Sequence, residues 1–528
     1  SSGTEPTVTA ASSKSLSDTV PLYTNLGSHH KPISTRVSAT QQYFDQGLRF
    51  VYGFNHAEAI RSFTRASELD PTCAMCYWGI ALAYGPHVNA PMDSASGIAA
   101  YAAAQKALAL KSHASASERA YIEAVAQRYE AVPPTDRARL DTMYSRAMER
   151  VANTYADDLD AATLYAESLM DLRPWNYWQP DGTPYPGTEE VVRQLQRVIS
   201  RNPDHPGACH YYIHAVEAVN PQAAVLCAER LAQLMPGEGH MVHMPAHIYI
   251  RVGRWNDAVQ ANQHAIHTDE VFLEEQHPMG VYPLAYYPHN IHFLAFASTM
   301  AGHSAQAIAA SKTLTSKVNL DAARQVALLQ EMLPYHALTL TTFGKWDDIL
   351  AEPLPPADIR FPYAMAYYAR GVAHAAKGQW AAAQAALDTV EAIKAATPDG
   401  ADGKTALSIA VHALSGEIAT RRGDLEAGIN HFREAAKIED AELYFEPPKW
   451  YYPIRHSLGA ALLKAGQHAE AEKVYREDLQ RFPENGWSLF GLAQAFRAQE
   501  KNTEAAETQA RFRRAWASTD VTLTASRF

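Results

Sequence analysis

Three histidines in the stretch GHMVHMPAH have a spacing suited to binding a metal ion from one helix. His240, His243 and His247 lie three and four residues apart, so they share one face if the segment is helical. Two histidines four residues apart can hold one ion, as they do in the HExxH arrangement of metalloproteases. The chain contains no HExxH, so that protease mechanism is not predicted. The alternative is a polar face on a helical scaffold.

The segments before and after this stretch contain similar residues. PGACHYYIHAVEAV holds two histidines four residues apart, and YPHNIHF holds two that are three apart. Among 23 histidines some clustering arises by chance, but seven on neighbouring helical segments favour a site. The alternative is a histidine-lined groove for an anionic or aromatic ligand. The predicted metal ligands are His210, His214, His243, His247 and His289, with His240 and His292 as secondary ligands.

Two carboxylates accompany these histidines. Glu217 follows His214 by three residues, and Glu167 lies in the preceding helical segment. Either carboxylate could bind the ion, hold an imidazole through a hydrogen bond or act as a general base. Imidazole with some carboxylate suits zinc, copper, iron or nickel, and we place zinc or copper first, with iron after them. Five or more ligands exceed one tetrahedral ion, which indicates higher coordination or a two-metal site.

The elements that must position these residues are pairs of helices with a repeating pattern. The stretch TQQYFDQGLRFVYGFNHAEAIRSFTRASELDP has small residues at Gly47 and Ala59 and ends on proline. Similar patterns occur in HIYIRVGRWNDAVQANQHA and SLGAALLKAGQHAEAEKVY. This pattern resembles the tetratricopeptide repeat (TPR), which has a period of about 34 residues. The resemblance implies an all-α solenoid of helical hairpins, a right-handed superhelix, with about nine to eleven helix pairs over residues 38–518.

The resemblance also implies where the histidines point. In tetratricopeptide proteins, residues three or four apart on the first helix of each pair line a concave groove. The seven histidines predicted as ligands, all within residues 160–302, match such positions on three consecutive first helices. Packed helices lie about 8–10 Å apart, so side chains from neighbouring helices can reach one ion. The blocks HPGACHYYIHAVE, HMPAHIYIRVGRW and YYPHNIHFLAFA resemble a group of bacterial tetratricopeptide proteins without a settled activity, so the resemblance implies no reaction.

Composition excludes some classes of protein and suggests a location. The formal net charge of −11 and the absence of a basic run argue against a nucleic-acid binder. No apolar stretch is long enough for a membrane span. Residues 1–37 begin with a Ser/Thr-rich leader that is typical of an exported protein, periplasmic or extracellular. The alternative is a disordered tail on a cytoplasmic protein. Residues 519–528 form a short C-terminal tail.

Four cysteines are disulfide candidates. Cys73 and Cys76, in CAMC, have the thioredoxin spacing, but no βαβ pattern surrounds them. A local disulfide or two buried thiols is therefore favoured over redox catalysis, and a separate soft-metal site is a weaker alternative. Cys209 and Cys227 fall on the two helices of one predicted pair, where they either form a disulfide or pack in the core.

Two classes of function follow from the sequence. The first is a metalloprotein, and as one form of it a metalloenzyme, with a small-molecule or peptide ligand in the groove. The second is a non-catalytic scaffold that binds protein segments, or that self-associates through its open repeat ends. Peptide-binding grooves of this kind use Asn, Lys and Arg, whereas this groove is predicted to be rich in His, which favours the first class.

Overall fold

The computed structural model describes residues 20–278 and 282–528, and the residues it describes form helices without a β-strand. The Ser/Thr-rich start of the predicted leader, residues 1–19, lies outside the described residues. The chain divides into two compact units, each treated separately below. Unit 1 is residues 20–215 with Gln233–Glu238, and unit 2 is Val216–Ala232 with Gly239–Phe528. The predicted all-α class is confirmed. None of the described helices is both long and apolar enough to cross a membrane.

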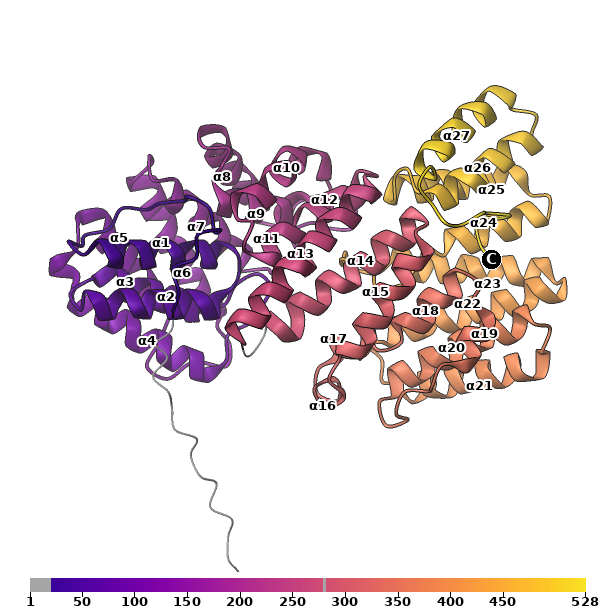
Figure 1. Cartoon of the computed structure of the whole chain (residues 1–528), viewed down its shortest axis with the longest axis horizontal. Helices are drawn as coiled ribbons and strands as arrows, with labels where there is room; N and C mark the ends of the chain where they lie inside the picture. Colours follow the sequence, from indigo (N-terminus) through magenta and orange to yellow (C-terminus); the bar gives the residue numbers. More distant parts are fainter. Residues whose placement is uncertain (1–19, 279–281) are drawn as a thin grey trace, which may run out of the picture. The chain divides into compact units, whose positions relative to one another are not determined.

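Unit 1 starts with residues 20–37, which have no regular structure, and continues as helices joined by turns and longer loops (Figure 1). Most of its helices pack on the next one or two along the chain. Its helices are α1 (Ser38–Tyr52), α2 (His56–Leu69), α3 (Ala74–Tyr84), α4 (Ser94–Ala109), η1 (Lys111–His113), α5 (Ala116–Ala126), α6 (Ala138–Thr154), α7 (Leu159–Met170), α8 (Thr188–Arg201) and α9 (Pro206–Val216).

Unit 2 has the same hairpin architecture, with most of its helices packed on their neighbours in the chain (Figure 1). Its helices are η2 (Pro221–Ala224), α10 (Val225–Leu234), α11 (Gly239–His243), α12 (Pro245–Arg251), α13 (Trp255–Gln276), η3 (Tyr282–Tyr286), α14 (Tyr287–Ala301), α15 (Ser304–Lys317), α16 (Leu320–Ala323), α17 (Ala327–Met332), α18 (Tyr335–Thr342), α19 (Trp346–Ala351), α20 (Arg360–Ala376), α21 (Trp380–Ala396), α22 (Lys404–Arg422), α23 (Leu425–Asp440), α24 (Arg455–Lys464), α25 (His468–Arg481), α26 (Gly486–Ala498) and α27 (Asn502–Ala515).

Small residues allow these helices to pack closely, as the sequence pattern predicts. The Phe63 side chain of α2 is fully buried between α1 and α3. A Cβ atom would lie 2.7 Å from the Phe63 ring at Gly47 and 2.5 Å from it at Gly79. Because real Cβ atoms essentially never approach so closely, only glycine permits this helix spacing. The repeated small residues therefore set how near successive helices come.

The histidine stripe of the opening stretch lies on two short helices rather than on one. The break falls at Met244, because Pro245 has no backbone N–H to continue the α-helical hydrogen bonding. The Met244 N–H still donates to the His240 carbonyl oxygen at 3.0 Å, and the His247 N–H donates to the Met244 oxygen at 3.1 Å. The chain therefore passes through a tight turn that keeps His243 and His247 on one side.

Candidate metal centre

Three imidazoles of unit 2 converge on one point. His243 ends α11, His247 lies in α12 and His289 lies in α14. The Nε2 atom of His243 is 2.9 Å from Nε2 of His247 and 3.1 Å from Nε2 of His289. The side chains of His243 and His247 are buried, and that of His289 is half-buried. The structure therefore brings together three of the five predicted core ligands, which we call the unit 2 triad.

The hydrogen bonds around the triad place protons on the Nδ1 atoms of His243 and His247. His243 Nδ1 is 2.7 Å from Oδ1 of Asn262, whose amide nitrogen donates to the Ala258 carbonyl oxygen. The Asn262 oxygen therefore accepts, and His243 Nδ1 donates. His247 Nδ1 donates to Glu217 Oε2 at 2.6 Å. A neutral imidazole protonated on Nδ1 carries a lone pair on Nε2, so the contact between the two Nε2 atoms needs a cation between them, either a shared proton or a metal ion.

Two lone pairs at this distance repel unless a cation lies between them. Two imidazole nitrogens bound to one zinc ion at 2.0–2.1 Å, in tetrahedral geometry, are about 3.3–3.4 Å apart. The separations of 2.9 and 3.1 Å differ from that value by a few tenths of an ångström, which small side-chain rotations can supply. Oxygen acceptors on the far ring nitrogen are the usual outer partners of metal-bound histidine. The triad thus has the donor atoms and their supports for a transition metal.

Two carboxyl groups, Glu217 and Glu446, lie near the triad and interact with its charge. Burial opposes protonation of His247, but the charge of Glu217 and its hydrogen bond outweigh burial and raise the His247 pKa. Glu217 also accepts a hydrogen bond from the Tyr444 hydroxyl at 3.2 Å. Burial raises the pKa of Glu446 to about 7, with Arg251 opposing and Glu217 adding to the rise. Glu217, predicted as a ligand or support, is placed as the support of His247.

The other supports of the triad cannot be recognised in the sequence. Asn262 is a fully buried amide on α13, and nothing in the sequence distinguishes it from an ordinary polar residue of a helix. Tyr444 and Glu446 belong to the proline-rich stretch YFEPPKWYYP, nearly 200 positions further along the chain than Asn262. The only sequence signal for this stretch was its prolines, which interrupt the helix pattern and indicate a loop between helices.

The two secondary ligands of unit 2 lie outside the triad. The His292 ring packs edge-on against Tyr335 at a centroid distance of 4.2 Å, and burial lowers the His292 pKa to about 3. The His240 ring lies 6.1 Å from the His243 ring and 4.6 Å from that of Tyr286. His292 therefore packs against an aromatic neighbour apart from the triad, and its role as a secondary ligand stays a prediction.

His210 and His214 form a pair within unit 1. Their ring centroids are 4.9 Å apart on α9, and His210 Nδ1 donates to the Tyr52 carbonyl oxygen at 2.6 Å. Trp175, from the insertion before α8, packs edge-on against His214 at 4.9 Å. These two histidines belong to unit 1 and the triad to unit 2, so the predicted meeting of all seven histidines stays a prediction.

Glu167 belongs to a different buried cluster of unit 1. It hydrogen-bonds Asp171, and both carboxyls lie near the guanidinium of Arg128, which donates to Asp171 Oδ2 at 2.6 Å. Burial raises the pKa of Glu167 against the opposing charge of Arg128. Burial and the neighbouring Glu167 raise the pKa of Asp171. The structure thus places Glu167 in a carboxyl pair beside a buried arginine, and its role as a ligand or general base stays a prediction.

The cysteines divide between a disulfide and buried positions. Cys73 and Cys76 form a disulfide at the start of α3. Cys209 and Cys227 are both buried. They belong to different units, so their predicted pairing stays a prediction.

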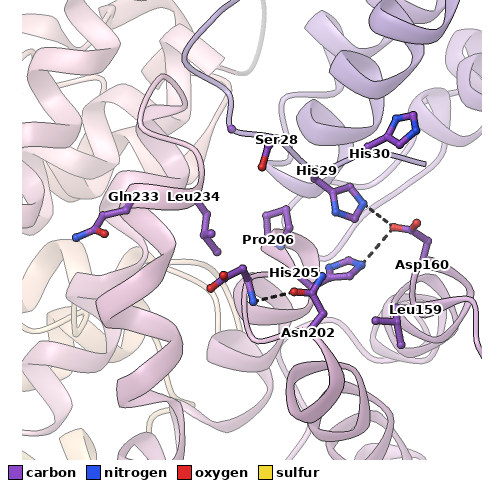
Figure 2. Close-up of a pocket in the computed structure, with 12 residues that line it drawn as sticks. Ser28, His29, His30, Leu159, Asp160, Asn202, His205, Pro206, Gln233 and Leu234 are labelled. Atoms are coloured by element: carbon purple, nitrogen blue, oxygen red, sulfur yellow. Dashed lines mark hydrogen bonds and ion pairs between the residues drawn. The ribbon is translucent and has the colours of Figure 1, made fainter. Parts of the chain in front are cut away.

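Unit 1 also contains a pocket of about 530 Å³ that the sequence analysis did not foresee. It lies between residues 27–30, the start of α7, the turn before α9, and Gln233 and Leu234, the last two residues of α10, which belong to unit 1. Figure 2 shows the rings of His29 and His205 directed at the carboxylate of Asp160. The two Nε2 atoms lie 2.9 Å and 3.2 Å from Asp160 Oδ1. These three residues come from three distant parts of the chain.

Comparison with known proteins adds a likeness in fold only. No protein-family model and no curated protein matches the chain. Human IFIT1, solved as a dimer with m7Gppp-AAAA, is 12% identical over 92% of this chain and 91% of its own, with a TM-score of 0.31. Yeast Tom70 is 11% identical over 90% and 93%, with a TM-score of 0.31. The TPR domain of P58(IPK) is 11% identical over 88% and 99%, with a TM-score of 0.21.

Similarity this low carries no ligand, partner or activity over to this chain. The tetratricopeptide-type architecture instead rests on the chain's own helix pairs and on the small residues that pack between them. The fold is therefore a helical-hairpin scaffold, on which function is decided by individual sites.

Proposed function

We propose that this helical-repeat scaffold binds a transition metal ion through His243, His247 and His289. The observation that carries the proposal is the convergence of three imidazole Nε2 atoms, two of them 2.9 Å apart, while oxygen acceptors hold the Nδ1 protons of His243 and His247 on the far side. A water molecule or a ligand group would complete a tetrahedral site. Neutral imidazoles favour zinc or copper, with iron next.

Elemental analysis of the full chain, purified without a metal-affinity tag, tests this proposal. We expect at least one equivalent of zinc or copper per chain, retained through gel filtration. Protein stripped with a chelator should take up one equivalent in a calorimetric titration with zinc. A chain that is isolated without metal and shows no binding of zinc, copper or iron would contradict the proposal and favour a scaffold without metal.

Replacing Asn262 with leucine is expected to weaken zinc binding about 10–100-fold, the usual cost of removing an outer partner of a metal-bound histidine. Leucine is similar in volume to asparagine but cannot accept the Nδ1 proton of His243, so the ring loses its fixed orientation. Competition with a chromophoric chelator measures the change. Gln263→Leu is the matched control, because Gln263 is the exposed neighbour on the same helix and should leave zinc affinity unchanged.

A second candidate function is a scaffold that binds other protein segments without a metal. The hairpin fold of both units favours it, because helical arrays of this type present extended surfaces to partners. The same metal analysis separates the two functions. A metal-free chain that retains its helical content would turn the search to protein partners and to self-association.

We also propose that the chain functions in an oxidising compartment, as an exported protein. The disulfide between Cys73 and Cys76 supports this, since disulfides persist in secreted and periplasmic proteins and are rare in the reducing cytosol. Mass spectrometry of protein alkylated directly from its native source would detect the Cys73–Cys76 link. Alkylation of both thiols in that sample would contradict the proposal.

A further inference from the structure

The histidine cluster of the unit 1 pocket resembles the unit 2 triad in composition but differs in where its protons lie. His205 precedes α9, and the backbone N–H of Ala208 in the first turn donates to His205 Nδ1 at 3.1 Å. That nitrogen uses its lone pair, so the ring proton lies on Nε2, which is directed at Asp160. The His205 ring has no lone pair left for an ion. Two histidines and one carboxylate therefore do not form a metal site here.

The proton on His29 is placed by the same carboxylate. Asp160 Oδ1 accepts hydrogen bonds from the Tyr52 hydroxyl and from His29 Nε2. An ionised carboxylate is only an acceptor, so His29 Nε2 carries the proton and His29 Nδ1 carries a lone pair. No residue that the structure describes bonds to His29 Nδ1, and His29 lines the pocket. The pocket wall thus presents the Nδ1 atom of His29 to a ligand.

The other groups that line the pocket are mostly neutral, and they include both hydrogen-bond donors and hydrogen-bond acceptors. Asn202 Oδ1 accepts the backbone N–H of Asp204 at 3.1 Å, which leaves the Asn202 amide N–H groups as donors. His30 Nδ1 is bonded to Asp45 at 2.7 Å, so a neutral His30 offers Nε2 as a second acceptor. The nearby Lys31 ammonium is paired with Asp158 at 2.8 Å. In the described part of the chain the pocket therefore lacks an unpaired cation for an anionic ligand.

We propose that this pocket binds a small neutral polyhydroxylated molecule, with His29 Nδ1 accepting a hydrogen bond from one ligand hydroxyl. A hydroxyl group both donates and accepts, so it matches the mixture of acceptors and amide donors on the wall. The pocket volume of about 530 Å³ falls within the usual size of small-molecule sites. Asp160 is a positioning residue, which acts by fixing the tautomer of His29.

Nuclear magnetic resonance on the full chain, labelled with ¹⁵N in its histidines, tests the proposal. Long-range ¹H–¹⁵N spectra should show His29 and His205 protonated on Nε2. The probes are D-glucose, glycerol, inorganic phosphate and zinc. We expect D-glucose or glycerol to shift the His29 signals in a saturable manner, and phosphate and zinc to leave them unchanged. Saturable binding of phosphate at His29, loss of the His205 Nε2 proton with zinc, or no response to either polyol would overturn the proposal.

Two variants separate binding from folding. His29→Phe keeps a ring but removes the acceptor, and should weaken polyol binding at least about tenfold, the effect of losing about 1.4 kcal/mol. Its control is His113→Phe, an exposed histidine of η1, which should bind normally. Asp160→Ala should mix the two His29 tautomers and weaken binding similarly. Unchanged affinity in a folded His29→Phe protein would refute the assignment.

Discussion

Simultaneous replacement of His243 and His247 with alanine is expected to abolish stoichiometric metal binding. Structural zinc sites in peptides gain about 10–16 kcal/mol from about four ligands, or roughly 3 kcal/mol for each. Loss of two imidazoles should then reduce zinc affinity about 10⁴-fold. His289 alone retains too few donors to hold an ion. Elemental analysis and competition with a chromophoric chelator measure the loss, and zinc should no longer raise the melting temperature.

The matched control is the double variant His264→Ala, His267→Ala. Both residues are exposed histidines of α13, three residues apart in the same unit, so this variant loses the same number of imidazoles. It should keep its metal. Circular dichroism must show native helical content for both proteins. A folded His243→Ala, His247→Ala protein with its full complement of metal would refute the triad as the site.

Replacement of Arg128 with leucine is expected to destabilise unit 1 by about 3–5 kcal/mol at pH 8, the usual cost of removing one partner of a buried ion pair. Arg128 and Asp171 have side chains only 1% and 3% exposed. The guanidinium also donates to the Pro86 carbonyl oxygen and stacks on Tyr144. Denaturant unfolding followed by helical circular dichroism measures the loss. Lys111→Leu is the control, because its pair with Glu123 is half exposed and should contribute less than about 1 kcal/mol.

The loss in the Arg128 variant should depend on pH. The pKa values of Glu167 and Asp171 are raised in the folded chain, chiefly by burial. Carboxyls with raised pKa stabilise the fold fully below their unfolded pKa of about 4, and this contribution falls as pH rises through the folded pKa. Removal of the arginine charge raises the folded pKa further, so the deficit should be smallest near pH 5 and grow toward pH 8. A deficit independent of pH would show that packing alone is lost.

The sequence by itself determined the helix pairs and the close pairing of His243 with His247. Glycine and alanine at fixed places in each pair predict which helices approach closely, as the contact of Gly47 and Gly79 with Phe63 confirms. A spacing of four residues places two side chains on one face of a helix, and the break at Pro245 left that relation intact. Both properties depend on neighbours within a few residues or within one repeat.

Only the tertiary structure decided which histidines converge in the triad and which pack against other side chains. His289 and His292 are three residues apart on α14, yet one joins the triad and the other packs against Tyr335 of α18. The sequence also could not show which ring nitrogen carries the proton, because that depends on the hydrogen-bond partner of each Nδ1 atom. The partner is Asn262 on α13 for His243 and Glu217 for His247. For His205 it is the backbone N–H of Ala208 at the start of α9. Whether one ring nitrogen of a histidine can bind a metal or instead donates a hydrogen bond depends on the partner of the other ring nitrogen. In this chain that partner is positioned by packing between segments that are distant in the sequence.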